Sequence, residues 1–168
     1  MEIILKKNRK VSFFILCFLM FCSCGNNVDF IEFKSIDNTV WKSNKKINFN
    51  FDITDTISPK NLFINIRNNQ DYGYSNLFVI TSLKFPNGTK VVDTLQYEMA
   101  NAKGEYLGVG FSNIKESKLF YKENKVFPNS GEYEFSIHHA MRKQGEVNPI
   151  AELRGIQDIG LSIEKITE

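Results

Sequence analysis

The sequence predicts an all-β fold, an antiparallel β-sandwich of about eight or nine strands that follows an N-terminal export signal. Apolar and polar residues alternate with a period of two in several segments, which leaves one face of each strand wet. Clusters of Gly, Pro, Asn and Ser separate these segments, and no stretch sustains the 3.6-residue period of a helix. An open barrel is the alternative arrangement of the same strands.

Residues 1–23 have the three parts of a bacterial lipoprotein signal peptide. The charged part contains Lys6, Lys7, Arg9 and Lys10. The apolar run from Val11 to Cys22 has 12 residues, whereas a bilayer-spanning helix needs about 20. We therefore expect this run to be cleaved off after the small residue Ser23 and not retained as an anchor.

Cys24 then becomes the first residue and the predicted lipidation site. Cys22 is the competing site, but the bulky Phe21 would then occupy the position where the peptidase usually requires a small side chain. A thioether-linked diacylglycerol and an amide-linked acyl chain such as palmitate would together hold the protein on the membrane, where one chain binds only marginally.

Residues 24–38 are mostly polar and are interpreted as the lipidated N-terminus and a tether. Residues 39–168 are assigned to one β-sandwich domain, because 145 residues after the signal match a common single-domain size.

The first predicted strand runs from Lys46 to Ile53, and Leu62, Ile64 and Ile66 repeat its alternation. Residues 77–80 are apolar at every position, which predicts a central strand covered on both faces. The turn at residues 86–88 then predicts an antiparallel hairpin.

The strand that follows this hairpin carries Leu95, Tyr97 and Met99 on one face. Residues 106–111 are interrupted by Gly108 and Gly110, which predicts a bulge or a close backbone approach, and residues 119–121 give a weaker strand signal.

Two strands are expected near the C-terminus. After a turn at residues 128–131, Glu132 to His139 should direct alternate side chains inward, and Ile159, Leu161 and Ile163 mark the last strand. Between them, residues 150–154 could form one helical turn that ends at Gly155.

The charge balance gives no electrostatic case for nucleic-acid binding. The signal peptide takes four basic residues and one acidic residue with it, which leaves 17 Lys plus Arg against 18 Asp plus Glu. Cys17, Cys22 and Cys24 are the three cysteines, so the domain has no thiol for a disulfide or metal site. Its stability must come from packing of its many aromatic residues.

No enzyme signature is present. The chain lacks the G-x-S-x-G nucleophile motif and the G-x-x-x-x-G-K phosphate loop. His138 and His139 are neighbours on a predicted strand and should point to opposite faces, so we interpret one as a core residue and the other as a surface residue. We expect no cofactor, no metal and no catalytic residues.

The candidate partner-binding residues are Arg67, Tyr72 and Tyr74. The two tyrosines lie in a polar, aromatic loop between apolar strands, and aromatic and Arg side chains dominate binding hot spots. An ordinary turn is the competing interpretation of the loop, and an ion pair with Asp71 or Asp158 is the competing interpretation of Arg67.

Seven segments in order resemble the gliding-motility lipoproteins of the GldH type. They are Trp41, Arg-Asn-Asn-Gln-Asp-Tyr at 67–72, Tyr-Ser-Asn-Leu at 74–77, Gly-Glu-Tyr-Leu-Gly-Val-Gly at 104–110, Gly-Glu-Tyr-Glu-Phe at 131–135, Ala-Met-Arg at 140–142, and Gly-Ile-Gln-Asp-Ile-Gly-Leu at 155–161. The resemblance spans nearly the whole predicted domain. It implies a non-enzymatic, lipid-anchored component of the gliding apparatus, which in the hosts of that family is linked to type IX secretion.

The expected partners are the membrane, through the lipid on Cys24, and other envelope proteins of that machinery. The absence of an acidic cluster directly after Cys24 favours a periplasm-facing position, most simply on the outer membrane. The alternative function is a glycan-binding lipoprotein of a polysaccharide uptake system, which rests on fold analogy alone.

Overall fold

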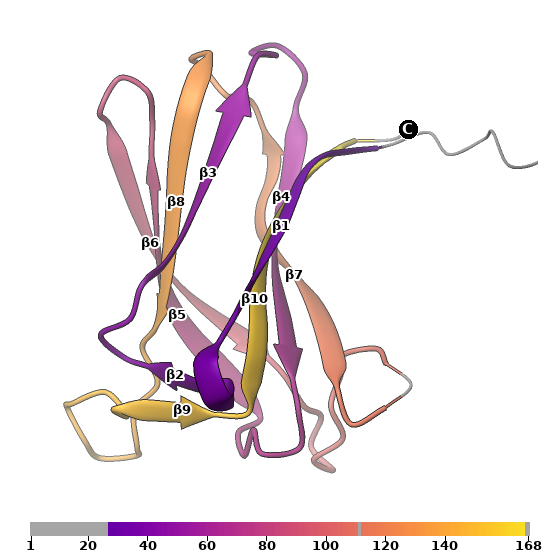
Figure 1. Cartoon of the computed structure of the whole chain (residues 1–168), viewed down its shortest axis with the longest axis vertical. Coiled ribbons are helices and arrows are strands. Elements are labelled where there is room, and N and C mark those ends of the chain that lie inside the picture. The colour runs from indigo at the N-terminus through magenta and orange to yellow at the C-terminus, as the bar shows by residue number, and fades with distance from the viewer. Residues whose placement is uncertain (1–26, 111, 167–168) are drawn as a thin grey trace, which may run out of the picture.

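The computed structural model describes residues 27–110 and 112–166, and it is an antiparallel β-sandwich (Figure 1). Its ten strands are β1 (Val28–Ser35), β2 (Val40–Lys42), β3 (Ile47–Ile53), β4 (Lys60–Asn68), β5 (Asn76–Lys84), β6 (Lys90–Glu98), β7 (Lys115–Lys125), β8 (Gly131–His139), β9 (Glu152–Arg154) and β10 (Ile156–Lys165). A short 3-10 turn, η1 (Asp37–Thr39), precedes β2. The sequence prediction of an all-β sandwich is confirmed, with ten strands in place of eight or nine.

Two four-stranded sheets form the layers of the sandwich. One sheet has the order β1-β10-β4-β7 and the other has the order β3-β8-β5-β6. The short strands β2 and β9 form a separate pair that closes one end of the molecule (Figure 1). All pairs are antiparallel, so connections between neighbouring strands can be short turns.

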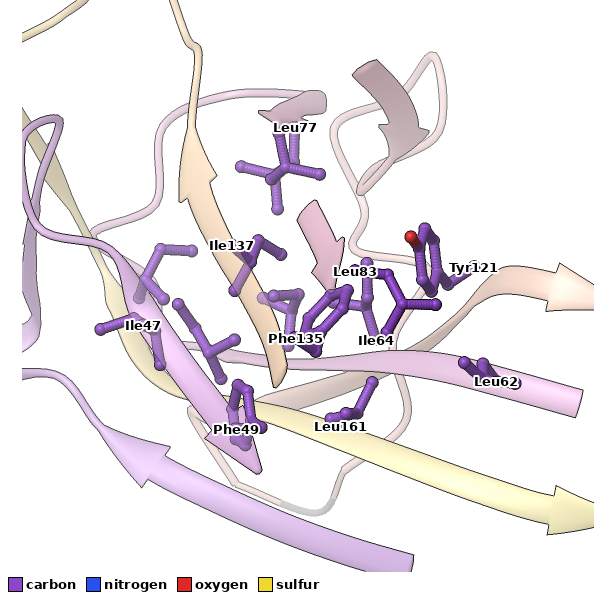
Figure 2. Close-up of a cluster of buried hydrophobic side chains, with 14 of the residues drawn as sticks. Ile47, Phe49, Leu62, Ile64, Leu77, Leu83, Tyr121, Phe135, Ile137 and Leu161 are labelled. Atoms are coloured by element: carbon purple, nitrogen blue, oxygen red, sulfur yellow. The ribbon is translucent and has the colours of Figure 1, made fainter. Parts of the chain in front are cut away.

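Aliphatic and aromatic side chains from both sheets fill the space between the layers (Figure 2). The alternation predicted from the sequence decides which side chains enter, since every second residue of β3 and of β8 is buried. The first sheet contributes Leu62, Ile64, Ile66, Ile159, Leu161 and Ile163, and the second contributes Phe49, Phe51, Leu77, Val79, Leu83, Tyr133, Phe135 and Ile137. Packing of these residues stabilises the fold, as the lack of domain cysteines requires.

The N-terminal part of the chain differs from the sequence prediction. The polar segment that was assigned to a tether contains β1, which pairs with β10 along the edge of the first sheet. Phe30 packs against Phe51 across the two layers, with ring centroids 5.5 Å apart. Polar residues such as Glu32 and Lys34 are tolerated in β1 because an edge strand is open to solvent on one side. The tether interpretation is therefore wrong for residues 28–35.

The segment near Gly155 also differs. Residues 152–154 are not a helical turn but the strand β9, which pairs with β2 more than a hundred residues earlier in the chain. Gly155 then turns the chain sharply into β10 with a positive φ of 85°. The backbone hydrogen bonds of this segment are made with β2, which is distant in the sequence, so the local residue pattern does not predict the strand.

Two further expectations are only partly correct. β5 is an interior strand of its sheet, but Phe78 and Ile80 on its outer face are half-buried, so only one face is fully covered. Residues 106–110 form isolated bridges in place of a strand, and Phe111 lies outside the described residues. The close approach expected at Gly110 is confirmed, because a Cβ there would lie 2.3 Å from the carbonyl oxygen of Ile114.

Candidate functional site

The loop that connects β4 to β5 carries Tyr72 and Tyr74, two of the three candidate binding residues. The side-chain oxygen of Asn69 accepts a hydrogen bond from the Asp71 amide at 2.9 Å, which is the Asx turn that starts the loop. The Asn69 amide donates to the Gly155 carbonyl at 2.9 Å and so attaches the loop to the junction of β9 and β10. The loop is a fixed structure at the end of the sandwich.

Tyr72 is a core residue and not a surface residue. Its side chain is 1% exposed, and its hydroxyl donates a hydrogen bond of 2.7 Å to the carbonyl of Asn76. Burial of the hydroxyl, with smaller effects of Tyr74 and Tyr106, raises the pKa of Tyr72 well above its ordinary value, so the phenol stays neutral. In this conformation its ring is not available to a partner protein.

Gly155 packs closely against the backbone of Asp71 and Tyr72. A Cβ at this position would lie 2.1 Å from the Tyr72 nitrogen and 2.6 Å from the Asp71 carbonyl carbon. A contact under 3.0 Å with backbone forces a shift, so only glycine fits both the turn and the approach.

Tyr106 fixes a second loop, between β6 and β7, onto the first. Its hydroxyl lies 2.6 Å from the carbonyl oxygen of Tyr72 and 3.3 Å from that of Asn69. Sequence reasoning assigned no role to Tyr106, although its place in a Gly-rich segment was a usable signal. Because of this bond, the two loops form one surface, which we call the loop surface and define by the exposed residues Tyr74, Leu107 and Val109.

Tyr74 is the candidate residue that the structure leaves accessible. Its side chain is 36% exposed, and its ring meets that of Tyr72 edge-on, with centroids 5.8 Å apart. Buried Tyr72 thus supports exposed Tyr74 from below. Contact of Tyr74 with a partner stays a prediction.

Arg67 lies near the end of β4, on the outer face of the first sheet. Its Nε donates to Glu116 Oε2 at 2.7 Å, and its Nη1 lies 3.8 Å from Asp158 Oδ2. Its guanidinium carbon lies 3.9 Å from the centre of the Phe33 ring. The ion pair with Asp158 was the competing interpretation from the sequence, and it is confirmed. Arg67 is thus held by two carboxylates, and its contact with a partner stays a prediction.

The two histidines point to opposite faces of β8, as predicted. His139 is 1% exposed, packs edge-on against Trp41 at 5.3 Å, and donates from Nε2 to the Trp41 carbonyl at 3.0 Å. Burial lowers the pKa of His139 below its ordinary 6.5, so the ring is neutral. In residues 27–110 and 112–166, no three or more His, Cys, Asp or Glu side chains lie close enough to hold a metal ion.

One groove of the structure is polar. It has a volume of about 540 Å³, lies between the open edges of the two sheets, and is lined by Glu32, Lys34, Asn48, Asn50 and Glu134. No aromatic ring lines it, so it lacks the flat stacking platform on which sugars commonly bind. It offers the glycan alternative no support.

Cys24, the predicted lipidation site, lies outside the described residues. The described chain begins at Asn27, whose carbonyl accepts a hydrogen bond of 2.8 Å from the Lys165 amide. In the described part of the chain, no helix combines the length and the hydropathy that a bilayer crossing requires.

Comparison with known proteins identifies relatives over nearly the whole chain. A "Gliding motility lipoprotein GldH homolog" of Christiangramia forsetii is 50% identical over 155 residues, which are 92% of this chain and 94% of the relative. The "Gliding motility lipoprotein GldH" of Flavobacterium johnsoniae is 38% identical over 151 residues, 90% of this chain and 93% of the relative.

Solved structures give a weaker likeness. The VP2 subviral particle of infectious bursal disease virus matches with a TM-score of 0.39 and 15% identity, over 81% of this chain and 32% of the viral chain. A likeness of this size carries no argument about function. The GldH lipoprotein family model, in contrast, matches residues 29–163, which contain β2 to β9 and most of β1 and β10. By this match and by its relatives, the chain belongs to the GldH lipoprotein family.

Proposed function

We propose that this protein is a lipid-anchored, non-enzymatic subunit of the envelope machinery for gliding motility and the type IX secretion linked to it. The observation that carries the proposal is the match to the GldH lipoprotein family over residues 29–163, in a chain whose residues 1–24 have the pattern of a lipoprotein signal. The names of both relatives support the parts of this role that concern gliding motility and a lipoprotein.

The described residues support a non-enzymatic role. His139 is buried and fixed on a backbone carbonyl, and His138 projects from the opposite face of the same strand. The polar groove between the sheet edges contains Glu32 and Glu134 but no nucleophile or histidine beside them. An acid, a base and a nucleophile must meet for most hydrolytic chemistry, and this groove does not bring them together.

The mechanism in this proposal is localisation followed by contact. A domain held on the membrane is confined to the same thin layer as a tethered partner, which raises their effective concentration and fills even a weak interface. The loop surface around Tyr74 is the proposed contact. We further propose that the anchor lies in the outer membrane and that the domain faces the periplasm.

The anchor is tested by replacing Cys24 with Ala in cells of the native host. We expect unprocessed or soluble protein, loss of the membrane fraction, and loss of gliding or of type IX secretion. Cys22→Ala is the matched control, which we expect to mature and fractionate like the wild type. Normal processing and firm membrane residence of Cys24→Ala would contradict the proposal.

The partner contact is tested separately by crosslinking in cells followed by affinity capture. Tyr74→Ala should reduce capture of envelope partners without unfolding the domain, because this side chain is exposed. Tyr72→Ala is unsuitable for this purpose, since it removes a core side chain. Capture that is unaffected by Tyr74→Ala would exclude this residue as a contact, and robust binding of the intact lipoprotein to a glycan array would favour the uptake alternative.

A further inference from the structure

The connection between the proposed lipid and the folded domain is very short. Only Gly25, Asn26 and Asn27 separate Cys24 from the first residue of β1. Four Cα-to-Cα steps can span at most about 14 Å, because an extended chain advances about 3.3–3.6 Å per residue. The acyl chains fix Cys24 at the bilayer surface, so the start of β1 cannot move far from the headgroups.

The start of β1 lies at one end of the sandwich, together with the end of β10 (Figure 1). The antiparallel register places the start of β4 and the end of β7 at the same end, since Lys165 pairs with Lys60 and Lys60 pairs with Lys125. The β3–β4 turn and the β7–β8 turn therefore project from this end. The loop surface lies at the opposite end of β4, a strand of nine residues and about 30 Å.

Exposed apolar side chains gather at the end of the first sheet from which the connection leaves. They are Val28, Ile57, Val126 and Ile166, with exposed fractions of 39%, 84%, 43% and 37%. We call these four residues the anchor-end row. They lie at the start of β1, in the turn before β4, just after β7 and just after β10, so each strand of this sheet contributes one.

Ile57 is held outward by its own turn. Asp55 Oδ1 accepts hydrogen bonds from the amides of Ile57 at 2.9 Å and Ser58 at 3.0 Å, and these bonds lower the pKa of Asp55 well below its ordinary value. The turn is therefore a preformed structure that presents an isoleucine to the surroundings. An apolar side chain with this exposure has a lower free energy against the headgroup region of a bilayer than in bulk water.

Two lysines at this end, Lys60 and Lys165, are paired with acids, whereas Lys125 at the end of β7 is in no ion pair within the described residues and lies over the Phe85 ring at 5.6 Å. Lys60 is almost fully buried and lies 2.5 Å from Asp29 and 3.5 Å from Asp55, and Lys165 lies 3.4 Å from Asp29. Attraction to anionic lipid headgroups requires clustered, unpaired cations. One lysine without an acid partner is not such a cluster, so we expect contact with a membrane at this end to depend on the short connection and the apolar row more than on charge.

We propose that the anchor-end row rests against the lipid headgroups and that the sandwich stands on the bilayer with the loop surface directed away from it. The proposal rests on the proposed lipidation of Cys24. Exposed apolar residues occur at both ends, since Val109 is 77% exposed, so apolarity alone does not choose between the ends. The three-residue connection decides which end faces the membrane, because it is too short to let the opposite end reach the bilayer.

The test uses the lack of cysteine after position 24, which permits a single added thiol to be labelled in the full lipoprotein. Ile57→Cys reports on the anchor end, Val109→Cys on the opposite end, and Phe120→Cys on the outer face of the first sheet. Each purified protein is labelled with a fluorophore and added to vesicles of phosphatidylethanolamine and phosphatidylglycerol that contain a nitroxide-headgroup lipid. We expect several-fold stronger quenching at position 57 than at positions 109 and 120.

Two controls separate the causes. Insertion of a 20-residue Gly/Ser segment between Asn27 and Val28 should reduce the quenching at position 57 toward the level at position 109, because such a segment behaves as a flexible coil. Vesicles without phosphatidylglycerol should give unchanged quenching. Quenching that survives the insertion, or that needs the anionic lipid, would overturn the proposed cause of the contact.

Equal quenching at positions 57 and 109, or stronger quenching at position 120, would overturn the orientation. Mass spectrometry of the N-terminal peptide in the same samples distinguishes the two possible failures. A lipid on Cys24 with no quenching at position 57 contradicts the orientation alone. Absence of the lipid contradicts both the orientation and the proposed function.

Discussion

Tyr72 and Tyr74 are two residues apart in one loop, yet they differ completely in their surroundings. Tyr72 is sealed inside the end of the sandwich, where it bonds to Asn76, while Tyr74 lies on top of it and reaches solvent. The sequence places both in a turn-rich segment and gives no signal for which one turns inward. That choice depends on the Tyr106 hydroxyl and on Gly155, which come from distant parts of the chain.

This difference predicts opposite effects of the same substitution. Tyr72→Ala should lower the free energy of unfolding by about 3–5 kcal/mol, because it leaves a cavity in the core. Tyr72→Phe should cost only about 1 kcal/mol, through the lost hydrogen bond to Asn76. Tyr74→Ala should change the stability by about 1 kcal/mol or less. Urea unfolding of the three variants measures these effects, and equal losses for Tyr72→Ala and Tyr74→Ala would contradict the assigned burial.

Gly155 and Gly145 form a matched pair for a second prediction. Their φ angles are 85° and 84°, but a Cβ would meet the Tyr72 backbone at Gly155 and nothing within 4 Å at Gly145. Gly145→Ala should therefore cost about 1 kcal/mol, the strain of the backbone conformation alone. Gly155→Ala should cost at least about 3 kcal/mol, because the clash is added to the strain. Similar losses in thermal or urea unfolding would show that the loop can move aside.

His139 predicts how stability depends on pH. Burial lowers its pKa in the folded protein, so below pH 6.5 the unfolded chain binds more protons than the folded one. Stability should be fully present above pH 6.5 and should fall as the pH falls through the folded pKa. His139→Gln should reduce this slope, and His138→Gln, on the partly exposed face of β8, should reduce it less. Urea unfolding between pH 5 and pH 8 checks this, and an identical slope in His139→Gln would contradict it.

Among the strands, those with strictly alternating burial were the most predictable. β3 and β8 each separate a dry inner face from a wetter outer face, so their alternation appears directly in the residue order. β1 was missed because polar residues occupy positions in an edge strand that borders solvent. β9 was missed because it has three residues, and its pairing with β2 is the reason it is extended. Strands defined by a distant partner carry little local signal.

The reassignment of residues 28–35 from tether to strand makes a prediction of its own. A domain that begins at Ile36 should unfold at lower urea than one that begins at Asn27, with a loss of about 2 kcal/mol or more. The reason is that Phe30 no longer covers Phe51 and β10 loses a paired edge. Ile31→Ser, at an exposed outer position, is the control and should change little. Equal stability of the two domains would support the original tether interpretation.

For the molecule as a whole, different features of the sequence indicate the fold and the family. Alternation and turns predicted the sandwich, while short segments such as those at 67–72 and 155–161 pointed to the family. Those two segments are in contact in the structure, because Gly155 packs against the backbone of the loop that follows Arg67 and accepts a hydrogen bond from it. Which candidate residues share a surface could not be predicted, since it depends on how two sheets and three long-range loops pack.

The proposed anchor, the proposed orientation and the proposed confinement near a partner all depend on acylation of Cys24. The direct measurement is mass spectrometry of the N-terminal peptide of the mature protein, purified from membranes of its native host. We predict a chain that begins at Cys24 and carries a thioether-linked diacylglycerol with an amide-linked acyl group. A mature N-terminus at any other residue, or an unmodified Cys24 in membrane-bound protein, would contradict the account.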